Sequence, residues 1–122
     1  ENNNITIHNM YAAVDCGLVV NPDQAVAQIQ GGMLFGISSA LHHEITLKGG
    51  IVEQNSFPDY PMLQMHEAPR VHVEFLESDA SMGGLGEPGV PPVAPAIGNA
   101  IFAATGKRIR ELPFAKTINR YS

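Results

Sequence analysis

One acidic side chain stands alone in a stretch of glycine and proline. Residues 83–95 read GGLGEPGVPPVAP, and Glu87 is the only charged residue among them. Glycine permits backbone conformations that other residues avoid, whereas proline fixes φ and removes an N–H donor, so the stretch specifies a stiff, irregular path. Held in a water-poor pocket, such a carboxylate is a candidate general base. The alternative is that it caps backbone N–H groups at the start of the following helix.

The glycines of residues 84–89 also match the pattern Gly-x-Gly-x-x-Gly of dinucleotide-binding folds. That pattern works because N–H groups at a helix N-terminus bind the pyrophosphate, but the prolines of this stretch remove such donors. The preceding strand is expected to end near Ser78 and the helix to begin near Pro91, so the pattern does not join them directly. We therefore discount a dinucleotide site.

Histidine and cysteine form no pattern for a metal or a nucleophile. His42 and His43 are adjacent and point in different directions on a helix, and the sequence has neither His-x-x-x-His nor a cysteine pair. Cys16 is the only cysteine and is expected to be a small buried hydrophobic residue. No Gly-x-Ser-x-Gly element is present. The sequence thus predicts no metal bound by protein side chains.

Composition limits the class of protein. A chain of 122 residues suits a single domain, residues 1–122, with one core. Charged residues make up 16%, below the average of about 25%, so we expect part of the outer surface to be covered by something else. A net charge of −5 without a basic run argues against nucleic acid. The apolar run of residues 33–41 is too short to span a membrane, which takes about 20 residues.

Two helices are predicted from apolar residues at helical spacing. The first begins at Pro22 after the cap residue Asn21. Its apolar stripe comprises Ala25, Ile29, Met33, Ile37 and Leu41. The second opens at Pro91-Pro92 and closes at Gly106. Its stripe comprises Val93, Ile97, Ile101 and Ala104.

The remaining elements are short strands and a loop. Residues 10–16 (MYAAVDC) suit a buried strand, and residues 71–78 (VHVEFLES) alternate as a half-buried strand does. A turn at residues 48–50 precedes a short strand at residues 51–57, and the proline-broken residues 57–70 are expected to be mostly loop. The predicted fold class is α+β, with short mixed strands packed against two main helices.

Gly31 and Gly32 lie inside the first predicted helix, where each glycine costs about 0.5–1 kcal/mol relative to alanine. Such a pair indicates that something approaches closely. One interpretation is that Gln28, one turn earlier, and the bare backbone face a ligand. The other is that a neighbouring segment packs tightly there.

Four blocks of sequence, in this order and at these separations, resemble a known family. They are VDCGLVVNPD, QIQGGMLFGISSAL, EQNSFPDYPMLQMHEAP and GLGEPGVPPVAPAIGNAIFAATGKRIRELPF. Together they resemble the C-terminal part of molybdenum hydroxylase large subunits, the xanthine dehydrogenase and aldehyde oxidase family. The nearest likeness is to the large (beta) subunit of isoquinoline 1-oxidoreductase-type enzymes. The resemblance covers the chain from about Tyr11 to Pro113.

The resemblance implies a cofactor and two site residues. The metal would be molybdenum held by the dithiolene of molybdopterin, as its cytosine dinucleotide, and not by protein side chains. Residues 84–87 match a family block whose glutamate acts as base beside the metal, which assigns that role to Glu87. Gln28 matches a glutamine that reaches the pterin. The implied reaction is oxidation of an aldehyde or N-heterocycle with oxygen derived from water.

Subunits of this family are several times longer than 122 residues. We therefore expect a C-terminal fragment or a separately expressed domain of the molybdopterin-binding region, which alone binds little or no cofactor and does not turn over. The implied partners are the remainder of the large subunit and an iron–sulfur subunit, and the bacterial periplasm is the favoured compartment. The alternative is a non-catalytic interaction module that retains the fold and binds a partner chain.

Overall fold

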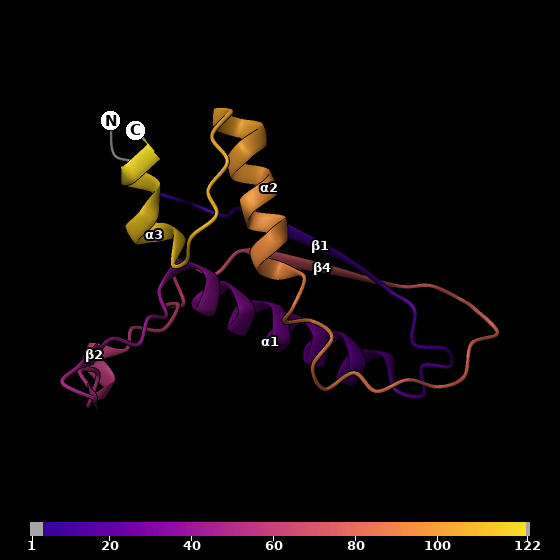
Figure 1. Ribbon diagram of the computed structural model, residues 1–122. Helices are drawn as coiled ribbons and strands as arrows, with labels where there is room; N and C mark the ends of the chain where they lie inside the picture. Colours follow the sequence, from indigo (N-terminus) through magenta and orange to yellow (C-terminus); the bar gives the residue numbers. More distant parts are fainter. Residues whose placement is uncertain (1–3, 122) are drawn as a thin grey trace.

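The computed structural model describes residues 4–121, and the side chains of residues 4–120. The longest element is helix α1, Pro22–Leu41, which runs through the lower half of Figure 1. Its first turn is capped as predicted, because the Asn21 side chain accepts a hydrogen bond from the Gln24 backbone N–H at 3.2 Å. All five residues of its predicted stripe are buried. No helix within residues 4–121 combines the length and apolar character needed to cross a membrane.

Two strands form a parallel pair beside α1. Strand β1, Asn9–Val14, pairs with β4, Arg70–Phe75, from Asn9 opposite Arg70 to Val14 opposite Phe75. The β4 strand alternates between half-buried and exposed residues, as the sequence predicted. The expectation that β1 is a buried strand is wrong for one face. Tyr11 is 75% exposed, because no element within residues 4–121 covers the outer face of the pair.

The core lies where α1, the β1–β4 pair and helix α2 meet. Helix α2, Val93–Thr105, ends at Gly106, whose φ of 72° is the left-handed cap conformation expected from the sequence. The most deeply buried large side chains are Ile29 and Ile37 from α1 and Val93 from α2. The predicted stripes of the two helices thus face each other across one core, except that Ala104, at the C-terminal end of the α2 stripe, is exposed.

The segment after α1 differs in part from the prediction. Strand β2, Leu47–Lys48, and strand β3, Ile51–Val52, form a small antiparallel hairpin around the predicted glycine turn. The strand expected over residues 51–57 is therefore only two residues long. A 3-10 helix, η1, follows at Phe57–Asp59. Figure 1 shows this region lying away from the two helices.

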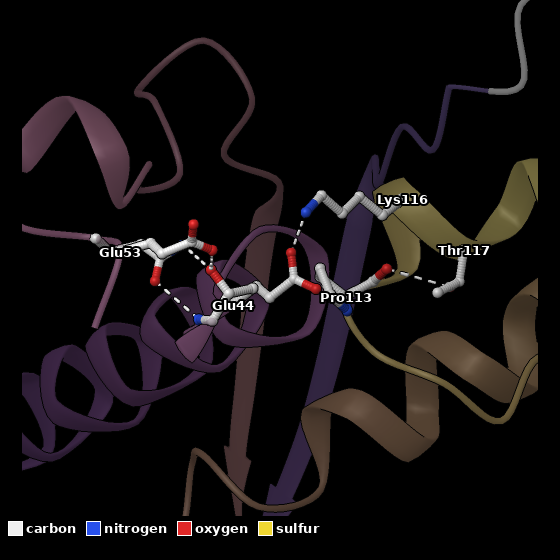
Figure 2. Close-up of polar contacts among 7 residues, drawn as sticks. Glu44, Glu53, Pro113, Lys116 and Thr117 are labelled. Carbon is white, nitrogen blue, oxygen red and sulfur yellow. Dashed lines mark hydrogen bonds and ion pairs between the residues drawn. The ribbon is translucent and has the colours of Figure 1, made fainter. Parts of the chain in front are cut away.

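The C-terminal segment, for which the sequence predicted no element, folds back onto the end of α1. It contains helix α3, Phe114–Thr117, and the 3-10 helix η2, Ile118–Tyr121. Figure 2 shows Lys116 pointing at the carboxylate of Glu44, with which it forms an ion pair. The hydroxyl of Thr117 donates to the Pro113 carbonyl at 3.1 Å. Phe114 of this segment is buried in the same core and lies against Gly98 of α2, so the segment closes the core beside α2.

Candidate functional site

The loop of residues 76–92 joins β4 to α2 and carries Glu87. The Glu87 side chain is exposed, and its carboxylate has no hydrogen-bond partner within residues 4–121. Its backbone carbonyl accepts a hydrogen bond from the Val90 N–H at 2.8 Å, which closes a turn. The N-cap residue of α2 is Pro92, and no side chain caps this helix. The capping interpretation of Glu87 is therefore wrong, and this chain alone does not surround Glu87 with a water-poor pocket.

Gln28 lies on the exposed side of α1 and reaches this loop directly. Its side-chain Nε2 donates a hydrogen bond of 2.9 Å to the backbone carbonyl of Gly86, the residue before Glu87. The two partners are 58 residues apart in the sequence. The structure thus brings together the two candidate residues that sequence analysis named separately.

Gly89 allows the loop to lie directly on α1. A Cβ placed on Gly89 would be 2.9 Å from the Ile29 carbonyl oxygen, which is closer than side-chain atoms normally come, and 3.4 Å from the Gly32 Cα. A Cβ on Gly32 would be 3.4 Å from the Gly89 Cα, an ordinary van der Waals contact, so the loop packs on Gly32 without a clash that would require glycine there. A Cβ on Gly31 would meet nothing within 4 Å, so packing does not explain that glycine. Figure 1 shows the chain before α2 passing over α1.

The packing of loop and helix continues at Gly36, which sequence analysis did not single out. A Cβ there would lie 2.9 Å from the Val93 side chain and 3.0 Å from the Val90 carbonyl oxygen. Gly32 and Gly36 are four residues apart and therefore lie on the same face of α1. Two glycines at this spacing in the sequence indicate that another backbone segment approaches this face of the helix.

Asp15 is a further residue of this region that sequence analysis missed. Its Oδ1 accepts a hydrogen bond from the Ser78 hydroxyl at 2.6 Å and one from the Gly17 N–H at 3.2 Å. These two bonds, first Ser78 and then Gly17, hold the pKa of the Asp15 carboxyl below its ordinary value. The sequence offered one signal for this role: Asp15 is an acidic residue at the end of a predicted strand, directly before Cys16 and Gly17.

Between its contacts with α1 and β1, the loop presents unpaired donors. The backbone N–H groups of residues 84–87 donate to no described group. A Cβ on Gly84 or Gly86 would meet nothing within 4 Å, so this edge of the loop is open. Within residues 4–121 no three His, Cys, Asp or Glu side chains gather as metal ligands. The arrangement therefore fits a group that offers hydrogen-bond acceptors and brings its own ligands for any metal.

Comparison with known proteins identifies the class of domain. Fold and loop together define an α+β unit in which one helix supports a glycine-rich loop beside an exposed carboxylate. The family model described as the molybdopterin cofactor-binding domain matches residues 1–69, which is more than half of the chain. The chain belongs to this family, as the sequence resemblance predicted.

Several relatives extend the match along the chain. It is 39% identical over 111 residues to the isoquinoline 1-oxidoreductase subunit beta of Brevundimonas diminuta, covering 91% of this chain and 14% of that protein. It is 37% identical over 116 residues to the putative xanthine dehydrogenase molybdenum-binding subunit of Escherichia coli K12, covering 89% of this chain and 15% of that one. The chain thus spans about a seventh of the length of these relatives. Both stretches are long enough to include Gln28 and Glu87.

A solved structure has the same fold. The crystal structure of quinoline 2-oxidoreductase from Pseudomonas putida 86 matches with a TM-score of 0.80 at 24% identity, covering 95% of this chain and 16% of that one. The predicted α+β class, as a part of a molybdopterin-binding region, is confirmed. At this identity the match shows the fold alone.

Proposed function

We propose that this chain is the part of a molybdenum hydroxylase that positions a general base, Glu87, at the molybdenum cofactor. The observation that carries the proposal is the hydrogen bond from Gln28 Nε2 to the Gly86 carbonyl, which fixes the loop immediately before Glu87 to α1. The proposed reaction is oxidation of an aldehyde or N-heterocycle with water-derived oxygen. The names of the relatives, among them isoquinoline 1-oxidoreductase and xanthine dehydrogenase, support this substrate class.

The residues that would hold the cofactor are those of the open loop edge and Gln28. One N–H of the Gln28 amide donates to Gly86, which leaves its other N–H and its carbonyl oxygen for the pterin. The unpaired N–H groups of residues 84–87 suit the oxygen atoms of the cofactor. When bound, molybdopterin supplies the redox-active molybdenum that takes up the two electrons of the oxidation.

Glu87 accepts a proton on a carboxylate oxygen in this proposal. General-base catalysis is typically worth about 10² to 10⁴ in rate, provided that the base is held at hydrogen-bond distance in one orientation. Pro88 restricts the backbone of Glu87, and Gly89 seats the next residues on α1, so the chain supplies that orientation. Exclusion of water from the exposed Glu87 is assigned to other parts of the assembled enzyme.

Replacement of Glu87 tests the base. In the molybdenum-loaded enzyme that contains this chain, Glu87→Gln should lower turnover by about 10² or more, because glutamine keeps the shape but cannot take up the proton. Molybdenum content should stay near that of the parent. The matched control is Glu77→Gln, an exposed glutamate of the same loop, which should retain turnover. Parental turnover in Glu87→Gln would refute the role.

Gln28→Ala tests the link to the cofactor. Loss of the bond to Gly86 frees the loop, so we expect lower molybdenum content in the purified enzyme. Gln24→Ala removes an exposed glutamine one turn earlier on α1 and serves as the control. Equal molybdenum in the Gln28 and Gln24 variants would contradict the assignment.

The assembly around the chain completes the proposal. We assign to it the cytosine dinucleotide form of the cofactor, the remainder of the large subunit, an iron–sulfur subunit and a periplasmic location. A second candidate, a module that binds a partner chain without catalysis, is favoured by exposed apolar side chains such as Phe57 (96%) and Met65 (92%). Turnover of the Glu87→Gln enzyme separates the catalytic role from the non-catalytic one, because turnover depends on the Glu87 carboxylate only if this chain takes part in the chemistry.

A further inference from the structure

We propose that Asp15 is a positioning residue for Glu87, because it clamps the beginning of the loop onto the end of β1. The inference rests on the proposed function, in which Glu87 must be held in one orientation. Gln28 and Gly89 fix only the later part of the loop, on α1. A loop held at one end retains freedom at the other, so a second fixed point decides how well Glu87 is placed.

The backbone beyond β4 stays bound to the backbone beyond β1. The Leu76 N–H donates to the Val14 carbonyl at 2.9 Å, where the parallel pair ends. Seven residues later the Gly83 N–H donates to the Cys16 carbonyl, also at 2.9 Å. Val14 and Cys16 are two residues apart and Leu76 and Gly83 are seven, so the longer segment bulges away from the shorter one, and a contact across the bulge would keep the second bond in register.

Asp15 supplies that contact. Its Oδ1 accepts from the Ser78 hydroxyl at 2.6 Å, and Ser78 Oγ in turn accepts from the Ala80 N–H at 3.3 Å. Oδ1 also accepts from the Gly17 N–H at 3.2 Å, which orients the carboxylate. One charged acceptor thus joins the end of β1 to the middle of the bulge, and hydrogen bonds to a charged group are stronger than neutral ones.

Gly17 shows how closely the two segments approach. Its φ of 69° lies in the left-handed region, and a Cβ at this position would be only 2.4 Å from the Ala80 carbonyl oxygen. No side chain can separate the segments there. The clamp on β1 holds the loop up to Gly83, and the contacts with α1 hold it at Gly86 and Gly89, so both kinds of contact flank or touch the edge that carries Glu87.

The test compares Asp15→Ala and Ser78→Ala with a matched control. Asp59, the last residue of η1, accepts a hydrogen bond of 2.7 Å from the hydroxyl of the N-cap residue Ser56, so Asp59→Ala removes an equivalent bond outside this loop. The first readout is hydrogen–deuterium exchange of the molybdenum-loaded enzyme that contains this chain. We expect the Gly83 amide to exchange about 3- to 10-fold faster in both clamp variants, which corresponds to the loss of one hydrogen bond, and unchanged in Asp59→Ala.

The second readout is steady-state kinetics of the molybdenum-loaded enzyme. In Asp15→Ala we expect kcat to fall by about 10- to 100-fold, the effect of a displaced catalytic group, with KM and molybdenum content unchanged. The Asp15→Ala/Ser78→Ala double variant should be no slower than Asp15→Ala, because both remove the same bond. Exchange at Gly83 equal to that of the Asp59 control, or a change in KM alone, would overturn the inference. Parental turnover in Glu87→Gln would instead defeat the proposed function, and the exchange result would still decide whether the clamp exists.

Discussion

Replacing Gly89 with alanine should push the loop of Glu87 away from α1. The new Cβ would lie 2.9 Å from the Ile29 carbonyl oxygen and 3.4 Å from both the Gly32 Cα and the Met33 N. All three are backbone atoms of a helix, so no side-chain rotation relieves the contact. The loop must therefore move by several tenths of an ångström, and the Gln28–Gly86 hydrogen bond stretches with it.

The cost of this movement follows from two opposing effects. Overpacking of a well-packed site typically costs about 1–3 kcal/mol. Alanine also restricts the unfolded chain, which offsets about 0.4–1 kcal/mol. We expect the free energy of unfolding to fall by about 1–2 kcal/mol, which for a domain of this size lowers the melting temperature by roughly 4–8 °C.

Thermal and urea unfolding, followed by circular dichroism, measure this effect. Gly84→Ala is the control, because a Cβ there meets no atom within 4 Å, and its stability should stay within about 0.5 kcal/mol of the parent. The urea dependence of both variants should keep the parental slope, so that the midpoint alone reports stability. If Gly89→Ala were as stable as Gly84→Ala, the loop would not be seated on α1 as described.

Two further predictions concern α1 and the residue that follows its C-cap. Gly31→Ala should raise the free energy of unfolding, measured with urea, by about 0.5–1 kcal/mol, because Gly31 is inside a helix and a Cβ there would meet no atom within 4 Å. An unchanged or lower free energy of unfolding would contradict the open space at Gly31. Burial, followed by the charge of His42, lowers the pKa of His43, which stacks on Tyr60 with ring centroids 4.3 Å apart. The unfolded state therefore binds the proton more readily, so stability is fully present above a pH of about 6.5 and declines as the pH falls through the lower folded-state pKa. Between pH 7 and 5, the urea unfolding midpoint of His43→Phe should fall less steeply than that of the parent. Replacement of the exposed His66 by Phe should leave the parental dependence on pH unchanged. If both variants showed the same dependence on pH, His43 would not be the cause of the decline.

The helices were predictable because their signals are local. The cap at Asn21, the four-residue repeat from Ala25 to Leu41 and the left-handed Gly106 each depend on neighbours within one or two turns. The parallel pairing of β1 with β4 was not predictable, since the two strands are about 60 residues apart and neither carries a signal for its partner or direction. For the same reason the exposure of Tyr11 became evident only from the fold.

The glycine–proline composition of the loop around Glu87, the buried face of α1, most of that of α2 and the membership of the molybdopterin cofactor-binding family could all be read from the sequence alone. Only the tertiary structure showed that Gln28 holds that loop at Gly86 and that Asp15 holds its beginning at Ser78. Each of these hydrogen bonds joins residues about 60 positions apart. Local propensities fix the conformation of each segment, but the distance between two segments depends on the whole path between them.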